Sequence, residues 1–261
     1  MLMPTQQLLE LLDLSVIDTT HFRGQSVRLL GTRIFGGQVL AQAIMAAAKT
    51  CNRPVHSLHG YFIRPSHSDF PIEYHVTTLR DGYQFSLRQV YAYQSERLIF
   101  SALISMSTES ADFDFQCPPP PYLVLPPMLE QPSAIHFHLQ IEPQPSHDTT
   151  AYYEYAKTYE VLTQQYDTQL YHQAIAAYYS DYNLLNMALK RLNLSEHTAD
   201  VMSASLDHSL YFHRKFRVDA WMLYQLHCST AQDGHGLNQS QLWQNNQLIC
   251  TAVKESLIRC F

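Results

Sequence analysis

The chain has 261 residues, a formal net charge of −6 and a hydrophobic fraction of 46%. This length and composition can bury a full core, so we expect one large domain or two modules of about 120 residues each. The acidic balance and the absence of any run of lysines or arginines argue against a phosphate backbone as partner, so we expect no binding of nucleic acid.

The sequence lacks the marks of a targeting or membrane-spanning segment. The first residues contain no basic region, and the apolar run from Leu8 to Leu14 is interrupted by Glu10 and Asp13. No segment reaches about 18 uninterrupted apolar residues. The five cysteines are scattered without a Cys-x-x-Cys spacing, which is typical of reduced packing residues. We therefore expect a cytoplasmic protein without a membrane span.

In the first half, the predicted elements are two helices followed by strands. Residues 6–14 have the pattern of a short amphipathic helix, and a longer apolar helix is predicted from Gly36 to Thr50. Segments rich in Val, Ile, Tyr and Phe and separated by turn signals predict strands over 55–64, 71–79, 83–94 and 97–108. Such a helix is expected to pack on one face of the antiparallel sheet that follows it.

A proline-rich segment divides the chain. Residues 117–127 contain six prolines in eleven residues, which disfavours a helix or a central strand and predicts a linker. The elements predicted beyond it are a strand over Ile135–Ile141, a helix over Tyr171–Leu192, and strands over 201–213, 219–230, 236–244 and 247–258. We therefore predict an N-terminal module over 1–116, a linker over 117–133 and a C-terminal module over 134–261.

The second half repeats the first. Tyr61–Arg64 (YFIR) recurs as Tyr211–Arg214 (YFHR), and Leu98–Ala102 (LIFSA) recurs as Leu248–Ala252 (LICTA), in both cases 150 residues later. An Asp-Gly turn lies between these segments in each half. Three landmarks in the same order favour internal duplication over coincidence. Two duplicated modules can join their sheets edge to edge, which pairs strand edges that would otherwise be exposed.

Several strings of the sequence form a recognisable signature. They lie at Phe22–Ser26, Ile34–Ala43, His56–Pro65, Ser180–Leu185 and Leu206–His213. In this order they resemble the acyl-CoA thioesterase II family, and the resemblance is weakest over about 117–170 and 231–247. It implies an α+β double hot-dog fold, with two long helices each wrapped by an antiparallel sheet. It also implies hydrolysis of acyl-CoA to free fatty acid and CoA, without a metal or bound cofactor.

The resemblance also implies three site residues. In the family an Asp on the second long helix, a Thr or Ser on the next strand and a Gln on the last strand hold the attacking water. The matching positions here are Asp181, Ser205 and Lys254, and the lysine is a departure. An ammonium beside Asp181 would lower the pKa of the carboxyl and weaken it as a base, whereas desolvation among neighbouring tyrosines would strengthen it.

The residues alone leave alternatives for these positions. Asp181 also suits an N-cap or a first helical turn, and Lys254 also suits a solvated strand end. Gly36-Gly37 could present backbone N–H groups to an oxyanion or could serve close helix packing. His56, His59, His208 and His213 are predicted to be strand residues satisfied by backbone partners, because no metal-site spacing accompanies them.

Two alternative functions stay open at this point. One is a hot-dog acyl-CoA binding protein that has lost hydrolysis, and the other is a hot-dog dehydratase, which needs a histidine and a carboxylate. A covalent acyl-serine mechanism is disfavoured because no Gly-x-Ser-x-Gly turn is present. We also expect a homo-oligomer, formed through sheet edges or apolar faces.

Overall fold

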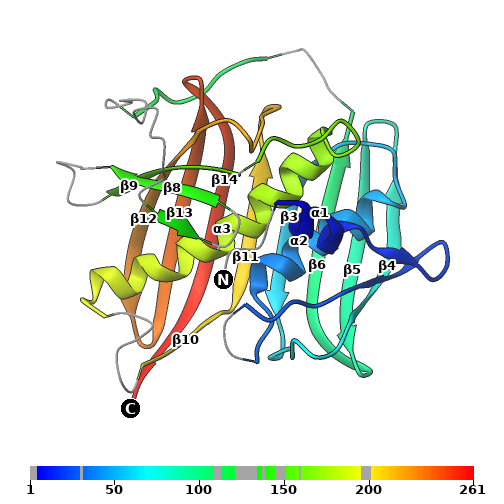
Figure 1. Cartoon of the computed structure of the whole chain (residues 1–261), viewed down its shortest axis with the longest axis horizontal. Helices are drawn as coiled ribbons and strands as arrows, with labels where there is room; N and C mark the ends of the chain where they lie inside the picture. The colour runs from blue at the N-terminus through cyan, green and yellow to red at the C-terminus, as the bar shows by residue number, and fades with distance from the viewer. Residues whose placement is uncertain are drawn as a thin grey trace.

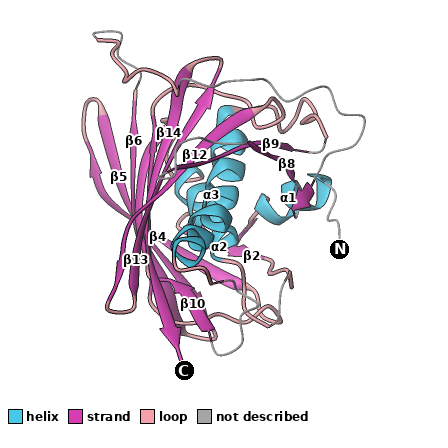
Figure 2. Ribbon diagram, turned by 90° about the vertical axis from the view of Figure 1, so that its left-hand side faces the viewer, coloured by secondary structure: helices cyan, strands magenta, loops and turns pink. Residues whose placement is uncertain are grey.

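The computed structural model describes residues 5–29, 32–108, 113–120, 134–136, 139–144, 151–158, 160–194 and 201–261. Its strands form a 14-stranded sheet, and the helices lie on the concave side of that sheet (Figures 1 and 2). Most of the predicted linker over 117–133 falls outside the described residues. The division into 1–116, 117–133 and 134–261 therefore stays a prediction.

The elements of the first half are α1 (Thr5–Leu12), β1 (Ser15–Val16), β2 (His21–Gly24), α2 (Gly36–Ala48), β3 (Val55–Phe62), β4 (Ile72–Asp81), β5 (Phe85–Gln94) and β6 (Arg97–Ser107). Those of the second half are β7 (Ala134–His136), β8 (Leu139–Gln144), β9 (Ala151–Thr158), α3 (Gln169–Arg191), β10 (Val201–Ser205), β11 (Asp207–Phe212), β12 (Met222–Gln232), β13 (His235–Gln244) and β14 (Gln247–Cys260). The strand order is β1-β2-β4-β5-β6-β3-β11-β14-β13-β12-β9-β8-β7, and β10 pairs with β14 beside β11.

The three predicted helices are confirmed, but some strand predictions were wrong. The strand predicted over 201–213 is broken at Leu206 into β10 and β11, and the one predicted over Ile135–Ile141 is two strands, β7 and β8. Three strands, β1, β2 and β9, were not predicted. The first two have only two and four residues, too few to show a period-two pattern.

Strand register confirms the duplication. His59 on β3 lies opposite Leu103 on β6, and Ser209 on β11 lies opposite Val253 on β14, which are the same positions 150 residues later. The irregularity between Ala92 and Tyr93 of β5 likewise recurs between Leu242 and Trp243 of β13. Because even the irregularities repeat, the two sheets are copies of one structure.

The two halves meet where β3 pairs with β11. In this antiparallel pair His59 lies opposite Ser209, which is its own duplicate 150 residues later. The His59 ring nitrogen Nδ1 lies 3.1 Å from the Ser209 hydroxyl. An approximate two-fold axis therefore passes between these strands. The sheets are joined edge to edge, as the double hot-dog fold requires.

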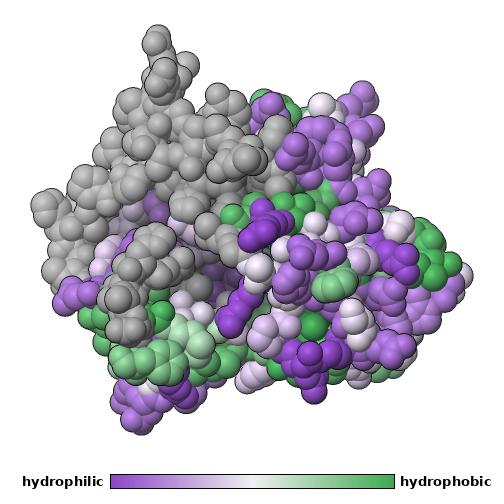
Figure 3. Space-filling view, turned by 60° about the horizontal axis from the view of Figure 1, so that its bottom comes forward, coloured by the Kyte–Doolittle hydropathy of each residue, from purple (hydrophilic) through white to green (hydrophobic). Residues whose placement is uncertain are grey.

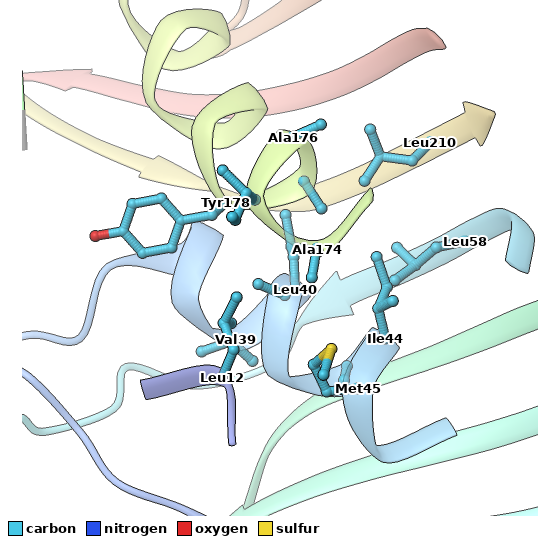
Figure 4. Packing of buried hydrophobic residues seen from close by; sticks show 14 of the residues in the cluster. Leu12, Val39, Leu40, Ile44, Met45, Leu58, Ala174, Ala176, Tyr178 and Leu210 are labelled. Atoms are coloured by element: carbon cyan, nitrogen blue, oxygen red, sulfur yellow. The ribbon is translucent and has the colours of Figure 1, made fainter. Parts of the chain in front are cut away.

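The core lies where α2 and α3 cross above the central strands (Figure 4). Leu40 and Ile44 of α2 and Ala174 of α3 pack there with Leu58 and Leu210, and all five are fully buried. Burying one leucine side chain contributes about 2 kcal/mol. The helices approach closely near the start of α2. None of the described helices is both long and apolar enough to span a membrane.

Candidate active site

Asp181 lies in the interior of α3. The helix begins at Gln169, so the alternative in which Asp181 caps a helix or occupies its first turn was wrong. The residue is only 3% exposed, and its carboxylate contacts Ser205 and Lys254 on strands of the second half. A buried carboxylate in mid-helix needs partners from other elements.

Ser205 and Lys254 supply those partners. The Lys254 ammonium donates to Asp181 Oδ1 at 2.7 Å and to the Asp181 backbone carbonyl at 2.9 Å. The Ser205 hydroxyl, at the end of β10, donates to the same Oδ1 at 3.1 Å. Lys254 is 0% exposed, because inward and outward side chains alternate along β14 and Lys254 points to the helices. The alternative of a solvated strand-end lysine was therefore wrong.

The ion pair fixes the charge state of Asp181. Burial raises the pKa of the Asp181 carboxyl, but the adjacent Lys254 charge and the hydrogen bonds from Lys254 and Ser205 lower it by more, so the net shift is downward. Both expected influences are present, desolvation raising the pKa and the Lys254 ammonium lowering it, and the net direction is the one that Lys254 favours. At neutral pH the group is a carboxylate.

The two carboxylate oxygens of Asp181 have different surroundings. Oδ1 accepts the hydrogen bonds from Lys254 and Ser205, whereas Oδ2 lies against the first turn of α2. A Cβ atom added to Gly36 would lie 2.6 Å from Oδ2. Among the described residues, neither the Gly36 nor the Gly37 N–H has a hydrogen-bond acceptor. Oδ2 and the positive end of α2 therefore face the same space.

That space is a pocket of about 750 Å³. Asp181, Ser205 and Gly36 line it, and most of its other lining residues are apolar: Leu29, Ile34, Phe35, Phe62, Ile63, Val201, Met202, Leu206 and Leu257. On the face in Figure 3, a hollow is bordered by hydrophilic side chains (purple) with hydrophobic ones (green) nearby. An apolar pocket with a few convergent polar groups is typical of a small-molecule site.

His208 lies beside Asp181, and its sequence pattern did not predict this position. Its Nε2 is 2.9 Å from the Ser180 hydroxyl, and its Nδ1 is 3.8 Å from Asp181 Oδ1. The Ser180 hydroxyl donates to the Ala177 carbonyl, so His208 Nε2 is the donor in the pair with Ser180. Burial lowers the pKa of His208 to about 3, so the ring is neutral at pH 7 and does not form an ion pair with Asp181.

The partners predicted for the strand histidines were wrong. His56, His59, His208 and His213 contact side-chain hydroxyls rather than backbone groups, namely those of Ser105, Ser209, Ser180 and Thr251. A hydroxyl both donates and accepts, so it can satisfy either ring tautomer. Within the described part of the chain, no group of three or more His, Cys, Asp or Glu side chains is placed to hold a metal ion.

The connection Ser180–His208–Asp181 has the order of a serine hydrolase triad, but not its geometry. Ser180 is 1% exposed and is not among the residues that line the pocket, and its hydroxyl already donates within its own helix. The 3.8 Å separation of His208 from Asp181 exceeds a hydrogen bond. Asp181 and Ser205, in contrast, both line the pocket.

Among the described residues, the first half carries no equivalent of Ser205, His208 and Lys254. With the 150-residue offset that the strand register confirms, Ser205, His208 and Lys254 correspond to Val55, Leu58 and Ile104. These three residues are apolar and buried. The polar cluster around Asp181 thus belongs to the second half, although α2 of the first half closes it.

Comparison with known proteins identifies the family. The profile described as "Acyl-CoA thioesterase N-terminal domain" matches residues 26–107, and the one described as "Acyl-CoA thioesterase" matches residues 134–257. The chain is 32% identical to "Acyl-CoA thioesterase 2" of Haemophilus influenzae, covering 97% of this chain and 96% of that protein. It is 33% identical to "Acyl-coenzyme A thioesterase 8" of Homo sapiens, covering 95% of this chain and 87% of that protein.

Solved structures agree with this. The acyl-CoA thioesterase II TesB2 from Mycobacterium marinum superposes with a TM-score of 0.83 at 28% identity, over 98% of each chain. Fold and site together define a double hot-dog thioester hydrolase. The chain belongs to the acyl-CoA thioesterase II family, and its enzymatic class is acyl-CoA thioesterase.

Proposed function

We propose that the enzyme hydrolyses acyl-CoA by direct attack of a water molecule that Asp181 activates, with Ser205 and Lys254 holding the carboxylate. The observation that supports this most is the asymmetry of Asp181, because Oδ1 is held by two donors while Oδ2 faces the pocket. A general base must lie within hydrogen-bond reach of the proton it removes. Oδ2 meets this requirement for a water in the pocket.

In the proposed reaction, water oxygen forms a bond to the thioester carbonyl carbon and gives one proton to Asp181 Oδ2. The tetrahedral intermediate then breaks its carbon–sulfur bond, releasing the fatty acid and the CoA thiolate, and the proton on Asp181 passes to the sulfur. Ser205 and Lys254 stabilise the carboxylate through Oδ1 during both steps. Holding the base in one orientation lowers the entropic cost of attack.

The first turn of α2 is the proposed oxyanion site. Gly36 lines the pocket beside Asp181 Oδ2, its N–H has no acceptor among the described residues, and the helix dipole places partial positive charge at this end of α2. Fixed donors aimed at a developing oxyanion contribute about 3–4 kcal/mol to transition-state stabilisation. The donor and the base thus come from different halves of the duplicated chain.

Lys254 and His208 bear on the two alternative functions, an acyl-CoA binding protein and a dehydratase. It faces Asp181, so the carboxylate is a weaker base than it would be beside a neutral amide, and a binding protein with weak hydrolysis stays a second candidate. A dehydratase is not favoured, because His208 is fully buried and does not line the pocket.

Release of free CoA thiol from a panel of acyl-CoAs tests the proposal. We expect turnover with at least one acyl chain, and a protein mass that stays unchanged when the reaction is quenched before one turnover is complete. An acylated peptide containing Ser180 would replace direct water attack with a covalent mechanism. Tight binding of acyl-CoA without thiol release would favour the binding protein.

A further inference from the structure

Among the described residues, the positive side chains that line the pocket have no carboxylate partner. Its charged lining residues are Arg33, Arg64 and Asp181, and the charge of Asp181 is balanced by Lys254. Both arginines are exposed, so their guanidinium groups reach the solvent side of the pocket. The whole chain carries a net charge of −6 and would repel a polyanion, which makes this local reversal of sign informative.

The duplication provides a direct comparison for Arg64. Its counterpart 150 residues later is Arg214, and the two make the same backbone contact: Arg64 Nη1 donates to the Leu98 carbonyl at 2.8 Å, and Arg214 Nη1 donates to the Leu248 carbonyl at 3.0 Å. Arg214 is also paired with the carboxylate of Asp114. No carboxylate among the described residues pairs with Arg64, which is the copy that lines the pocket with Asp181.

Backbone pairing holds Arg33 close to the segment that follows Arg64. Arg33 forms an isolated antiparallel bridge with His67, and on either side of it Ile34 N donates to the Ser66 carbonyl at 3.4 Å and Ser68 N to the Thr32 carbonyl at 2.9 Å. Within the described residues, the Arg33 guanidinium has no acceptor. The backbone segments that carry these two cationic side chains are thus held next to each other at the pocket.

We propose that Arg33 and Arg64 bind the phosphate groups of the CoA portion of the substrate, while the thioester lies at Asp181. This inference rests on the proposed function and adds the recognition of the leaving group. CoA carries a diphosphate and a ribose phosphate, and a guanidinium can donate two parallel hydrogen bonds to a phosphate. The attraction also guides a polyanion to a protein whose overall charge is of the same sign.

Substrates with and without phosphate test the proposal. The same acyl group is offered as its CoA thioester and as its pantetheine thioester, which has the same reacting bond and no phosphate. For Arg33→Gln and Arg64→Gln we expect KM for acyl-CoA to rise by about tenfold, the loss for one charge-assisted contact, with kcat nearly unchanged. We expect KM for acyl-pantetheine to stay at the wild-type value.

Arg214→Gln is the matched control. It removes the same arginine-to-carbonyl bond in the duplicate and also the ion pair with Asp114, so its structural cost is at least that of Arg64→Gln, and it does not touch the pocket. We expect it to leave both KM values unchanged. Dephospho-CoA thioesters, which lack the ribose phosphate, then show which phosphate each arginine binds. If Arg64→Gln or Arg33→Gln raises KM less for the dephospho-CoA thioester than for acyl-CoA, that arginine binds the ribose phosphate. An equal rise in KM assigns it to the diphosphate.

The outcomes separate this proposal from the proposed function. Equal losses on acyl-CoA and acyl-pantetheine, or no loss on either, would overturn phosphate recognition by these arginines while leaving hydrolysis intact. Wild-type protein that releases no thiol from either thioester would instead overturn the proposed function. Salt gives a second measure: raising ionic strength should increase KM for acyl-CoA in the wild type and have less effect in the double variant.

Discussion

Lys254 is the residue at which the site departs from the family pattern, in which the resemblance implies a glutamine. Its ammonium donates to Asp181 Oδ1 at 2.7 Å without any exposure to solvent. A buried ion pair of this kind is costly to break but does not by itself stabilise the fold. Its chemical effect is to hold Asp181 as a carboxylate at lower pH, at the expense of basicity.

Lys254→Gln should move the acid limb of the pH–rate profile. Removing the ammonium removes the largest influence that lowers the pKa of Asp181, so that pKa rises and the acid limb of kcat shifts to higher pH. Turnover at neutral pH should rise or stay equal, because one donor to the carboxylate is kept. A loss of about tenfold, about 1.4 kcal/mol, would show that the charge itself supports the transition state.

Glu154 makes stability depend on pH outside the site. Burial raises the pKa of this carboxyl from 4.5 to about 7, although the Tyr179 hydroxyl donates to it at 2.7 Å. Below pH 4.5 the group is protonated both folded and unfolded and costs nothing. Between pH 4.5 and 7 only the unfolded chain ionises, so stability is lost, by about 3 kcal/mol once the folded pKa is passed.

Glu154→Gln should therefore remove this loss. Free energies of unfolding in urea, measured for both proteins at pH 5 and pH 8, should show a larger fall for the wild type than for the variant, by about 2 kcal/mol. Parallel changes in the two proteins would show that Glu154 ionises normally in the folded state.

Among the elements, the first turn of α2 makes the tightest contact with the site. A Cβ on Gly37 would lie 2.1 Å from the backbone carbonyl of Tyr178, so only glycine allows α2 and α3 to come this close. A Cβ on Gly36 would instead meet the Asp181 carboxylate at 2.6 Å. We therefore expect the two neighbouring glycines to act differently: Gly37 allows the close packing of α2 on α3, and Gly36 leaves room for the Asp181 carboxylate.

Alanine at each position should separate these uses. Gly37→Ala forces two backbones apart and should lower the free energy of unfolding by about 2–3 kcal/mol. Gly36→Ala displaces a side chain instead, so it should cost less stability but reduce kcat by about tenfold or more, because the base is moved. Urea unfolding and thiol release measure the two effects. The same change in both properties for both variants would contradict the distinction.

At this scale the sequence predicted more of the helices than of the strands. The helices α2 and α3 show long apolar patterns in the sequence. The pair Gly36-Gly37 at the start of the first of these patterns already suggested free backbone N–H groups. The break at Leu206 was not predictable from periodicity, because a single residue separates β10 from β11 and both strands pair with the same strand, β14. Ser205 is the last residue of β10 before this break, and its hydroxyl donates to Asp181.

For the whole molecule, the 150-residue offset in the sequence was sufficient to predict the duplication and the edge-to-edge sheet. The resemblance placed Asp181, Ser205 and Lys254 together, and the structure does bring them into contact. Residues that come from distant parts of the chain were missed, such as His208 beside Asp181 and the side-chain partners of the strand histidines. A homo-oligomer remains a prediction.

We propose Asp181 as the base of a polar cluster that the first half does not repeat, since Val55, Leu58 and Ile104 occupy the positions that match Ser205, His208 and Lys254. Thiol release from acyl-CoA by Asp181→Asn, compared with Ser180→Ala and with the wild type, tests it most directly. We expect Asp181→Asn to fold and to lose about a thousandfold in kcat, about 4 kcal/mol, because an amide cannot take a proton from water. Ser180→Ala should stay near the wild-type kcat. An Asp181→Asn enzyme with wild-type turnover, or a Ser180→Ala enzyme that is inactive though folded, would contradict the assignment.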